Sequence, residues 1–472
     1  MEKIKKFFKL EENGTNVKTE FIAGLTTFCA MVYILMVNAG MFADLAIVGN
    51  DVTYGAIYIA TAISAIVGTV LIGLLANLPL AQASGMGLNA FFVYTICFGF
   101  GFTYANALVM VLIDGVVFII LTATGLRKKI FEAIPESVRK AIPAGIGLFI
   151  AFIGLQGTGI VVNDDATLVG LASINTLTQS WATIMPILLT ILVLFAIAIM
   201  AHRKMKGAVL WGILGGTIVY YLLGLTISGF YDAGGAGAIT WTSPFDAFGE
   251  FGTKAVGKVF TDGFNFSAYI DAHGTGNFIL ILITSALAFC MVDMFDTMGT
   301  LYGACARGNM LTPEGEVPNM NRAMLADAIA TTTGAICGTS TVTTYVESSA
   351  GIAAGGRTGL SSMFTALFFL IAMFLSPVAQ LIPGVVTNAA LIYVGVLMMA
   401  GVKDLDWTEI DVAVPAFLTI AMMPFTYNIS YGIAFGMIAY VIIKLCTGKV
   451  KEINVGTYVV AALFLAMLLF TH

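Results

Sequence analysis

The chain has 472 residues, of which 59% are hydrophobic and 10% are charged, and its mean hydropathy is +0.95. Soluble domains carry about 25% charged residues, so this composition excludes a soluble enzyme and indicates an integral membrane protein. The formal net charge of −5 is small for this length, so we expect no nucleic-acid partner.

The predicted elements begin with residues 1–20, which are basic and amphipathic and lack a signal core with a cleavage site. This pattern predicts a retained cytoplasmic N-terminus. Apolar runs long enough to cross a hydrocarbon core of about 30 Å then recur along the chain. They predict fourteen spans, near 21–42, 54–76, 84–98, 105–124, 142–160, 181–200, 207–228, 277–303, 321–338, 340–356, 359–382, 386–401, 411–425 and 428–445. A last apolar piece, 456–470, either crosses the membrane or lies in its surface.

The positions of Lys and Arg support this order of spans. With the N-terminus inside, 20 of the 22 basic residues fall on the cytoplasmic side, among them Arg127, Lys128 and Lys129, and only Lys254 and Lys258 fall outside. Cytoplasmic loops of multi-pass proteins carry such an excess of basic residues. The pattern predicts a multi-pass protein of the inner (cytoplasmic) membrane.

An internal repeat relates the two halves of the chain. Three pairs of stretches align in the same order, each pair seven spans apart: FCAMVYILMVNAGM (28–41) with FCMVDMFDTMGTLY (289–302), PAGIGLFIAFIGLQG (143–157) with TNAALIYVGVLMMAG (387–401), and GAVLWGILGGTIVYYLLG (207–224) with SYGIAFGMIAYVIIKLCTG (430–448). Because seven is odd, the halves have opposite orientation. We therefore expect an all-α membrane fold of 7+7 inverted repeats, the plan of secondary transporters.

Two spans in corresponding positions are unsuited to a continuous helix. PLAQASGMGLNAFF (79–92) is rich in Gly and polar residues, and GTSTVTTYVESSAGIAAGG (338–356) contains a β-branched run followed by small residues. Irregular backbone at membrane depth is tolerated only where it is buried in protein or lines a cavity. We expect two short extended segments near the bilayer centre in these broken spans, the third and tenth, each leading into a half-helix.

Polar side chains in and near these broken spans form a candidate binding site. Asp293, Asp296 and Thr300 are three and four residues apart, so they share one helical face. With them we place the polar residues of the broken spans: Asn89, Thr344, Tyr345, Glu347 and Ser348. Since no basic residue lies inside the spans, the site suits a hydrogen-bond-rich neutral solute or a cation. Asp293, Asp296 and Glu347 are candidate proton carriers, because a carboxyl buried in a membrane protein can gain and lose a proton near neutral pH.

At these residues the chain resembles a known family. GMGLNAFF (85–92), FDTMGTL (295–301) and TTYVESSAGIAAGGRTGL (343–360) look like the nucleobase–cation symporters, in their azaguanine-permease-like branch of purine permeases. The resemblance covers essentially the whole chain. It implies a uracil-permease-like fold and proton-coupled import of a purine base by an elevator movement, in which one domain slides against the other.

The resemblance also implies roles for single residues. Glu347 would accept hydrogen bonds from the N–H edge of the purine, and Asp296 would hold the place of the acid in the eighth span. Asp293 would be a second acid typical of this branch, and Asn89 matches its asparagine. Where relatives in the wider family have a His near the acid of the eighth span, this chain has Thr300, which puts proton coupling through that position in doubt.

The implied domain organisation follows the two repeats. Spans 1–4 and 8–11 would form a core domain and the remaining spans a gate domain, and relatives of this fold are often homodimers. In residue ranges, this gives an N-terminal segment 1–20, core halves 21–124 and 277–382, gate halves 142–228 and 386–446, an extracellular loop 229–276 and a C-terminal segment 447–472.

Other interpretations of these residues stay open. Each acid, like Asn89 and Tyr345, could serve packing alone, and Asp114 and Asp327 are expected to be structural hydrogen-bonding residues. An anion exchanger or channel of the same fold would need positive potential where the three acids stand. An intramembrane aspartyl enzyme would need two facing carboxylates, and its Gly-x-Gly-Asp signature is absent, so we predict no enzyme. The cysteines lack C-x-x-C spacing and GTKAVGKV (252–259) departs from a phosphate-binding loop at Val259, so neither a metal site nor a cofactor is expected.

Overall fold

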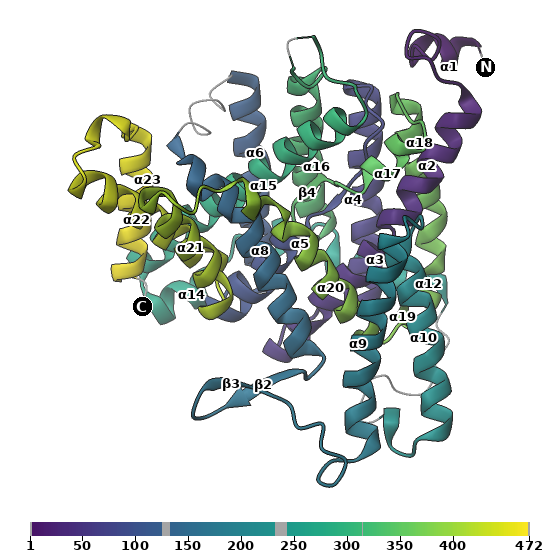
Figure 1. Ribbon diagram of the computed structural model, residues 1–472, viewed down its shortest axis with the longest axis horizontal. Coiled ribbons are helices and arrows are strands. Elements are labelled where there is room, and N and C mark those ends of the chain that lie inside the picture. The colour runs from purple at the N-terminus through teal and green to yellow at the C-terminus, as the bar shows by residue number, and fades with distance from the viewer. Residues whose placement is uncertain (1, 125–132, 232–242, 314, 471–472) are drawn as a thin grey trace.

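The computed structural model describes residues 2–124, 133–231, 243–313 and 315–470. Arg127, Lys128 and Lys129 lie outside the described residues, as does the part 232–242 of the predicted extracellular loop. Figure 1 shows a bundle of helices in which segments from both halves of the chain interleave.

Apart from α1, which lies in the predicted N-terminal segment, the helices of the first half follow the predicted spans with small shifts at their ends. They are α1 (Glu2–Phe7), α2 (Val17–Met31), α3 (Tyr33–Ala43), α4 (Tyr54–Leu75), α5 (Met86–Ala90) with a π-helical continuation (Phe91–Gly99), α6 (Tyr104–Thr124), α8 (Glu136–Gly157), α9 (Trp181–His202) and α10 (Ala208–Thr226). α2 and α3 together form the first span, which continues as a 3₁₀ turn to Val48.

The helices of the second half are similarly placed. They are α15 (Thr275–Arg307), α16 (Met320–Cys337), α17 (Ser348–Ala353), α18 (Gly359–Ala372), α19 (Ser376–Gln380), α20 (Gly384–Met398), α21 (Ile410–Phe425), α22 (Ile429–Cys446) and α23 (Val455–Phe470). Within the described residues, ten helical segments are long and apolar enough to cross a membrane, and Met86–Gly99, α21 and α23 are shorter apolar helices. The polytopic helical architecture is confirmed, and the number fourteen stays a prediction. α23 packs against α22 and α15.

The broken spans have the predicted extended segments. β1 (Gln82–Ser84) precedes α5 and β4 (Val342–Thr344) precedes α17, and the two strands pair antiparallel with Ala83 opposite Thr343. Both strands are fully buried. Their pairing satisfies backbone N–H and C=O groups that would otherwise be costly inside a membrane, and the β-branched run of β4 favours extended backbone.

Helix contacts divide the bundle into two groups. In the first group, α4 packs against α3, α16 and α18, and α6 packs against α15 and α16. The half-helices join this group, since α5 packs against α3 and α17 packs against α2 and α15. In the second group, α8 packs against α20, α21 and α22, and α9 packs against α10 and α20. The groups meet where α3 touches α20 and α5 touches α8, and we call this contact the seam.

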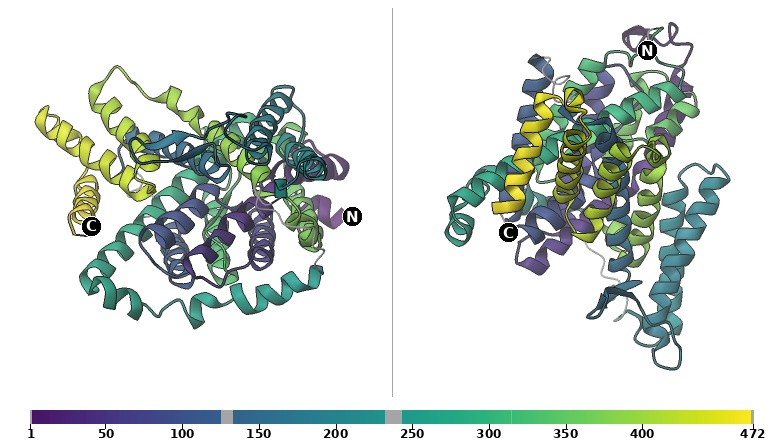
Figure 2. Two further views of the ribbon diagram at one scale, coloured as in Figure 1. Left: turned by 90° about the horizontal axis from the view of Figure 1, so that it is seen from below. Right: turned by 60° about the vertical axis from the view of Figure 1, so that its left-hand side comes forward.

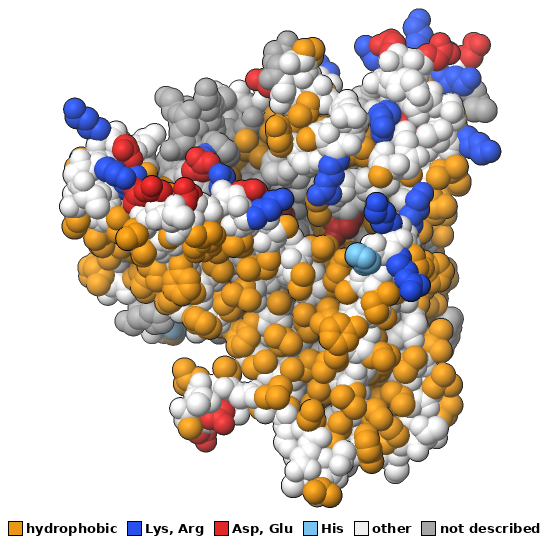
Figure 3. All heavy atoms as spheres, viewed as in Figure 1, with side chains coloured by type: hydrophobic (Ala, Val, Ile, Leu, Met, Phe, Trp, Pro, Cys, Tyr) orange, Lys and Arg blue, Asp and Glu red, His pale blue; other side chains and the backbone are white. Residues whose placement is uncertain are grey.

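The two ends of the bundle differ. Figure 3 shows Lys and Arg side chains gathered toward the end that carries α1, above a broad band of hydrophobic side chains. We call this the basic end. At the opposite end α8 leads into a hairpin of β2 (Val161–Asp164) and β3 (Leu168–Leu171), which the sequence did not predict.

The extracellular loop predicted at 229–276 is helical in its described part. It contains α12 (Pro244–Glu250), α13 (Lys258–Thr261) and α14 (Ser267–His273), which run along one side of the bundle in Figure 2. α12 packs against α4, and α13 packs against α6 and α16. The described loop is therefore docked on the first group of helices.

Candidate functional site

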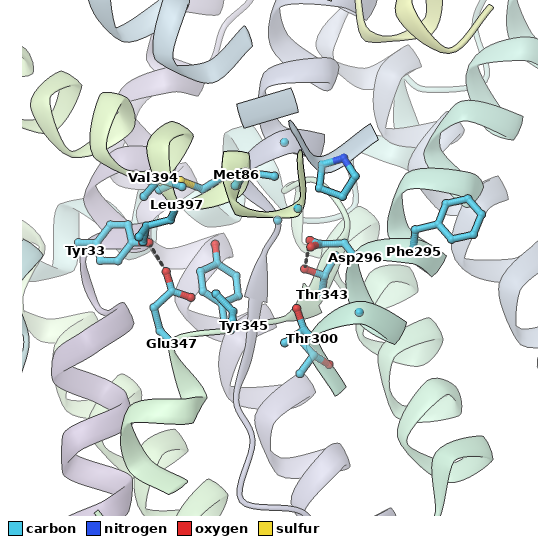
Figure 4. Close-up of a pocket in the computed structure, with 18 residues that line it drawn as sticks. Tyr33, Met86, Phe295, Asp296, Thr300, Thr343, Tyr345, Glu347, Val394 and Leu397 are labelled. Atoms are coloured by element: carbon cyan, nitrogen blue, oxygen red, sulfur yellow. Dashed lines mark hydrogen bonds between the residues drawn. The ribbon is translucent and has the colours of Figure 1, made fainter. Parts of the chain in front are cut away.

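A cavity of about 350 Å³ lies on the seam, beside the paired strands β1 and β4. Figure 4 shows Glu347 and Asp296 entering it from opposite sides, with Tyr345 between them. Both acids belong to the first group of helices. The second group contributes apolar residues, Val394 and Leu397 of α20. The site thus has a polar wall and an apolar wall on different helix groups.

Glu347 immediately precedes α17, where the chain turns from the extended segment into the half-helix. The hydroxyl of Tyr33, in α3, donates a hydrogen bond of 2.7 Å to Oε1 of Glu347. A bond to a charged acceptor is stronger than one between neutral groups. Tyr33 therefore fixes the orientation of the carboxylate at the edge of the cavity.

Asp296 faces the same cavity from α15. Its Oδ2 accepts a hydrogen bond of 3.3 Å from the hydroxyl of Thr343, in β4. Thr300, one helical turn further along α15, also lines the cavity. Asp296 and Thr300 thus share the helical face that the sequence predicted for them.

Tyr345 and its neighbours tie the site to the broken span opposite. The Tyr345 hydroxyl donates to the carbonyl oxygen of Ser84 at 2.5 Å, and its backbone N–H donates to Ala81. Thr344 lines the cavity, and its hydroxyl donates to Asp327 at 3.3 Å. Ser348 accepts a hydrogen bond from the Ala81 backbone N–H at 3.0 Å, so it joins the two broken spans and does not line the cavity.

Asp293 and Asn89 are fully buried away from the cavity. The Thr331 hydroxyl lies 3.1 Å from Oδ2 of Asp293 and 3.1 Å from the carbonyl oxygen of Val342, so its one hydrogen is shared between these two acceptors. The Asn89 amide donates to the carbonyl oxygen of Ser84 at 3.4 Å. Both contacts brace the strands that carry the site.

The two acids expected to be structural differ from each other. Asp327 accepts hydrogen bonds from Gln82 at 3.0 Å and from Thr297 at 2.8 Å, which fits that expectation. Asp114 is also fully buried, but within the described residues neither of its oxygens has a hydrogen-bond partner. The packing of α6 against α15 and α16 encloses Asp114 without giving it a donor, so the expectation of a structural hydrogen bond is wrong there.

Charge in the cavity is one-sided. Among the described residues that line it there is no Lys, Arg or His, and the acids are Asp296 and Glu347. The described part of the chain also has no group of three or more His, Cys, Asp or Glu placed to hold a metal ion. The arrangement favours a neutral solute with several N–H donors, or a cation.

Sequence reasoning missed several residues of the site. Tyr33 and Thr343 hold the two acids, and Met86 and Leu397 line the cavity with apolar surface. One signal was available for Tyr33: it lies in the stretch 28–41 that aligns with the acidic stretch 289–302 of the second half. The apolar residues carry no such signal, because they resemble every other apolar residue of a span.

The protein is a helical membrane bundle, and its two broken spans meet at a polar cavity between two helix groups. This architecture is that of a solute transporter rather than an enzyme. The comparisons identify its family. The chain belongs to the Permease family, whose sequence profile matches residues 18–435. The predicted resemblance to purine permeases is confirmed by relatives named adenine permease and guanine/hypoxanthine permease.

Relatives named as permeases match this chain over nearly the full length of both sequences. A putative permease of Methanocaldococcus jannaschii is 40% identical, and the match covers 98% of each chain. The guanine/hypoxanthine permease PbuO of Bacillus subtilis is 39% identical, with 98% of this chain and 99% of the relative covered. The adenine permease AdeP of Escherichia coli is 36% identical, with 99% and 96% covered.

Solved structures share the fold at low sequence identity. The transmembrane domain of the cyanobacterial bicarbonate transporter BicA superposes with a TM-score of 0.60 at 16% identity, covering 88% of this chain and 97% of that domain. The murine anion transporter Slc26a9 in its inward-facing state gives a TM-score of 0.62 at 12% identity, covering 91% and 68%. The predicted uracil-permease-like fold class is confirmed.

Proposed function

We propose that this chain imports purine nucleobases across the cell membrane through the cavity at the seam. The observation that carries the proposal is the pair of acids, Glu347 and Asp296, that face one cavity lined on its other side by apolar residues. The printed names of full-length relatives, adenine permease and guanine/hypoxanthine permease, support the choice of solute.

The chemistry of a purine fits these walls. Guanine and hypoxanthine present N–H donors on their edge, and a carboxylate oxygen accepts them with charge-assisted hydrogen bonds. Tyr33 donates to Oε1 of Glu347, and the base would bind at the carboxylate from the cavity side. The faces of the ring would lie against Met86 and Leu397, as apolar walls usually cover a planar ligand.

We further propose that protons drive the import and that Asp293, Asp296 and Glu347 are the carriers. Asp296 and Glu347 face the cavity, whereas Asp293 lies behind it, so the first two would exchange protons as the base binds. Protonation of a buried carboxyl removes a charge that is expensive to move through a membrane. A neutral, loaded site would then cross more easily than a charged, empty one.

The movement that we propose is an elevator. The first group of helices, as the core, would carry both acids and slide along the second group, as the gate. The cavity reaches toward the basic end, where Pro143 and Gly401 line it close to the contact between Lys140 and Asp404. With the basic end in the cytoplasm, as the distribution of Lys and Arg favours, this arrangement would be the inward-facing state of the proposed movement.

The test is uptake of labelled hypoxanthine by cells expressing the protein, at outside pH 5.5 and pH 8, beside a Glu347→Gln variant. Saturable uptake that is faster at acid pH and lost in the variant is the expected result. Absence of uptake of every purine, with the protein present in the membrane, would overturn the substrate assignment. The same cells should then be assayed for bicarbonate and sulfate.

A further inference from the structure

A second cavity, of about 440 Å³, lies on the same seam toward the end opposite the basic end. Its walls come from both helix groups. The first group contributes Asp44, which follows α3, and Tyr94; the second group contributes Gln156 at the end of α8 and Asn388 near the start of α20. Tyr427, between α21 and α22, completes it.

The two cavities lie one after the other along the seam. α3 lines the first with Tyr33 and the second with Val37, which is one helical turn away. α20 lines the first with Val394 and the second with Leu391. Val37, Leu391 and Val394 are 2%, 4% and 7% exposed, so close apolar packing separates the two spaces.

The polar groups of the second cavity have capacity for a ligand. Tyr94 donates a hydrogen bond of 2.7 Å to Oδ2 of Asp44, which leaves Oδ1 as an acceptor. Gln156 and Asn388 each bring a carbonyl and an NH₂ group, and neither amide hydrogen-bonds to another residue in the described part of the chain. A Cβ added to Gly157 would lie 2.7 Å from the Asn388 amide nitrogen, so the absence of a side chain there makes room for this amide.

Aromatic rings form the rest of the wall. Tyr427 has a positive φ of 55°, and its ring meets Tyr94 edge-on at 5.7 Å and Phe149 at 5.3 Å. A tyrosine held in this rarely used backbone region marks a locally constrained position. The contact between Tyr94 and Tyr427 also joins the two helix groups at this end of the seam.

We propose that this second cavity is a weaker binding site for the same purine bases, which a base occupies before it reaches the acids. The inference rests on the proposed function and adds a site to it. The volume lies within the range of about 300–1,000 Å³ that is typical of small-molecule sites. Two amides, a carboxylate oxygen and tyrosine rings match a flat ligand that carries donors and acceptors on its edge.

The chemistry selects a base rather than a simple ion. A cation could use the Asp44 carboxylate and the amide carbonyls of Gln156 and Asn388, but it would leave their NH₂ donors without an acceptor. An anion would meet the Asp44 carboxylate. A purine uses both kinds of group at once, since adenine, guanine and hypoxanthine all present donors next to acceptors.

The experiment counts sites by equilibrium binding of tritiated hypoxanthine to the purified full-length protein. Four proteins are compared: wild type, Glu347→Gln, the double variant Gln156→Ala/Asn388→Ala, and the control Asn163→Ala. Asn163 is an exposed asparagine in β2, at the same end of the molecule and outside both cavities. Thermal unfolding of each protein checks that it is folded.

The expected result is two classes of site in wild type and in the control. Glu347→Gln should keep only the weaker class. The double variant should keep the tighter class with unchanged Kd and weaken the other by about tenfold or more, since two hydrogen-bonding groups are lost. Uptake by the double variant should show a raised KM.

Two results would overturn the inference in distinguishable ways. A single class in wild type that Glu347→Gln abolishes, with normal binding and uptake in a folded double variant, refutes the second site and leaves the proposed function intact. No hypoxanthine, guanine or adenine binding by folded wild-type protein refutes the proposed function, and the second site with it.

Discussion

Removing the Tyr33 hydroxyl should weaken purine binding without unfolding the protein. In Tyr33→Phe the ring and its packing remain, but Glu347 loses the hydrogen bond of 2.7 Å that orients it. A hydrogen bond to a charged group contributes about 1.5–3 kcal/mol. If that energy holds the carboxylate in its binding position, its loss corresponds to a decrease in affinity of between about tenfold and about 150-fold.

The assay is hypoxanthine uptake as a function of concentration, normalised to the amount of protein in the membrane, together with Kd on purified protein. We expect a raised KM and a raised Kd. Tyr58→Phe is the matched control, because Tyr58 is also buried and its hydroxyl donates to the carbonyl oxygen of Ala372 at 2.8 Å, outside the cavity. Equal KM values in wild type and Tyr33→Phe, or an equal rise in Tyr58→Phe, would refute the assigned role of Tyr33.

Three further predictions concern the second acid, an enclosed acid and the stability of the bundle. Thr343→Val should raise the KM of uptake about threefold, which is less than for Tyr33→Phe, because the hydrogen bond from Thr343 to Asp296 is longer, at 3.3 Å. Uptake kinetics measure the change in KM, and a total loss of uptake in folded protein would contradict the prediction. Asp114→Asn should keep near-normal uptake and a near-normal unfolding temperature. A buried carboxyl without a hydrogen-bond partner is costly to ionise, and the Asn side chain has the shape of the neutral carboxyl. Loss of uptake in a folded variant would show that Asp114 has to ionise. Glu20→Ala should lower the free energy of unfolding by about 2–3 kcal/mol, because the buried Glu20 carboxylate accepts hydrogen bonds from the Ser361 hydroxyl at 2.6 Å and from the Ser361 backbone N–H at 3.1 Å, in the first turn of α18. An unchanged thermal or denaturant unfolding curve in detergent would contradict this contribution.

Part of the site could be predicted because its signal is local in the sequence. Carboxylates at Asp296 and Glu347 stand out against apolar surroundings, and the cost of charge in a membrane makes such residues functional candidates. The structure brings both to one cavity. Asp293 shows the limit of this reasoning. It shares the acidic stretch with Asp296, yet it is fully buried against Thr331, because a separation of three residues turns a side chain about 60° around a helix.

The sequence by itself determined the class of architecture. Hydropathy predicts where helices lie, because the membrane core tolerates little other backbone structure. Local sequence also marks the two broken spans, because backbone preference is a local property. One contains the β-branched run with Val342–Thr344, and the corresponding stretch 79–92 gives a weaker signal. The order of three aligned stretches further indicated that the two halves repeat.

Only the tertiary structure decided which of these residues meet. The hydrogen bond between Tyr33 and Glu347 joins positions 314 residues apart, and the second cavity forms from side chains of five separate segments. Neither follows from a periodicity, since a pattern along a helix tells which face is buried and not which partner covers it. The packing of α3 against α20 makes that choice, and with it places both cavities on one seam.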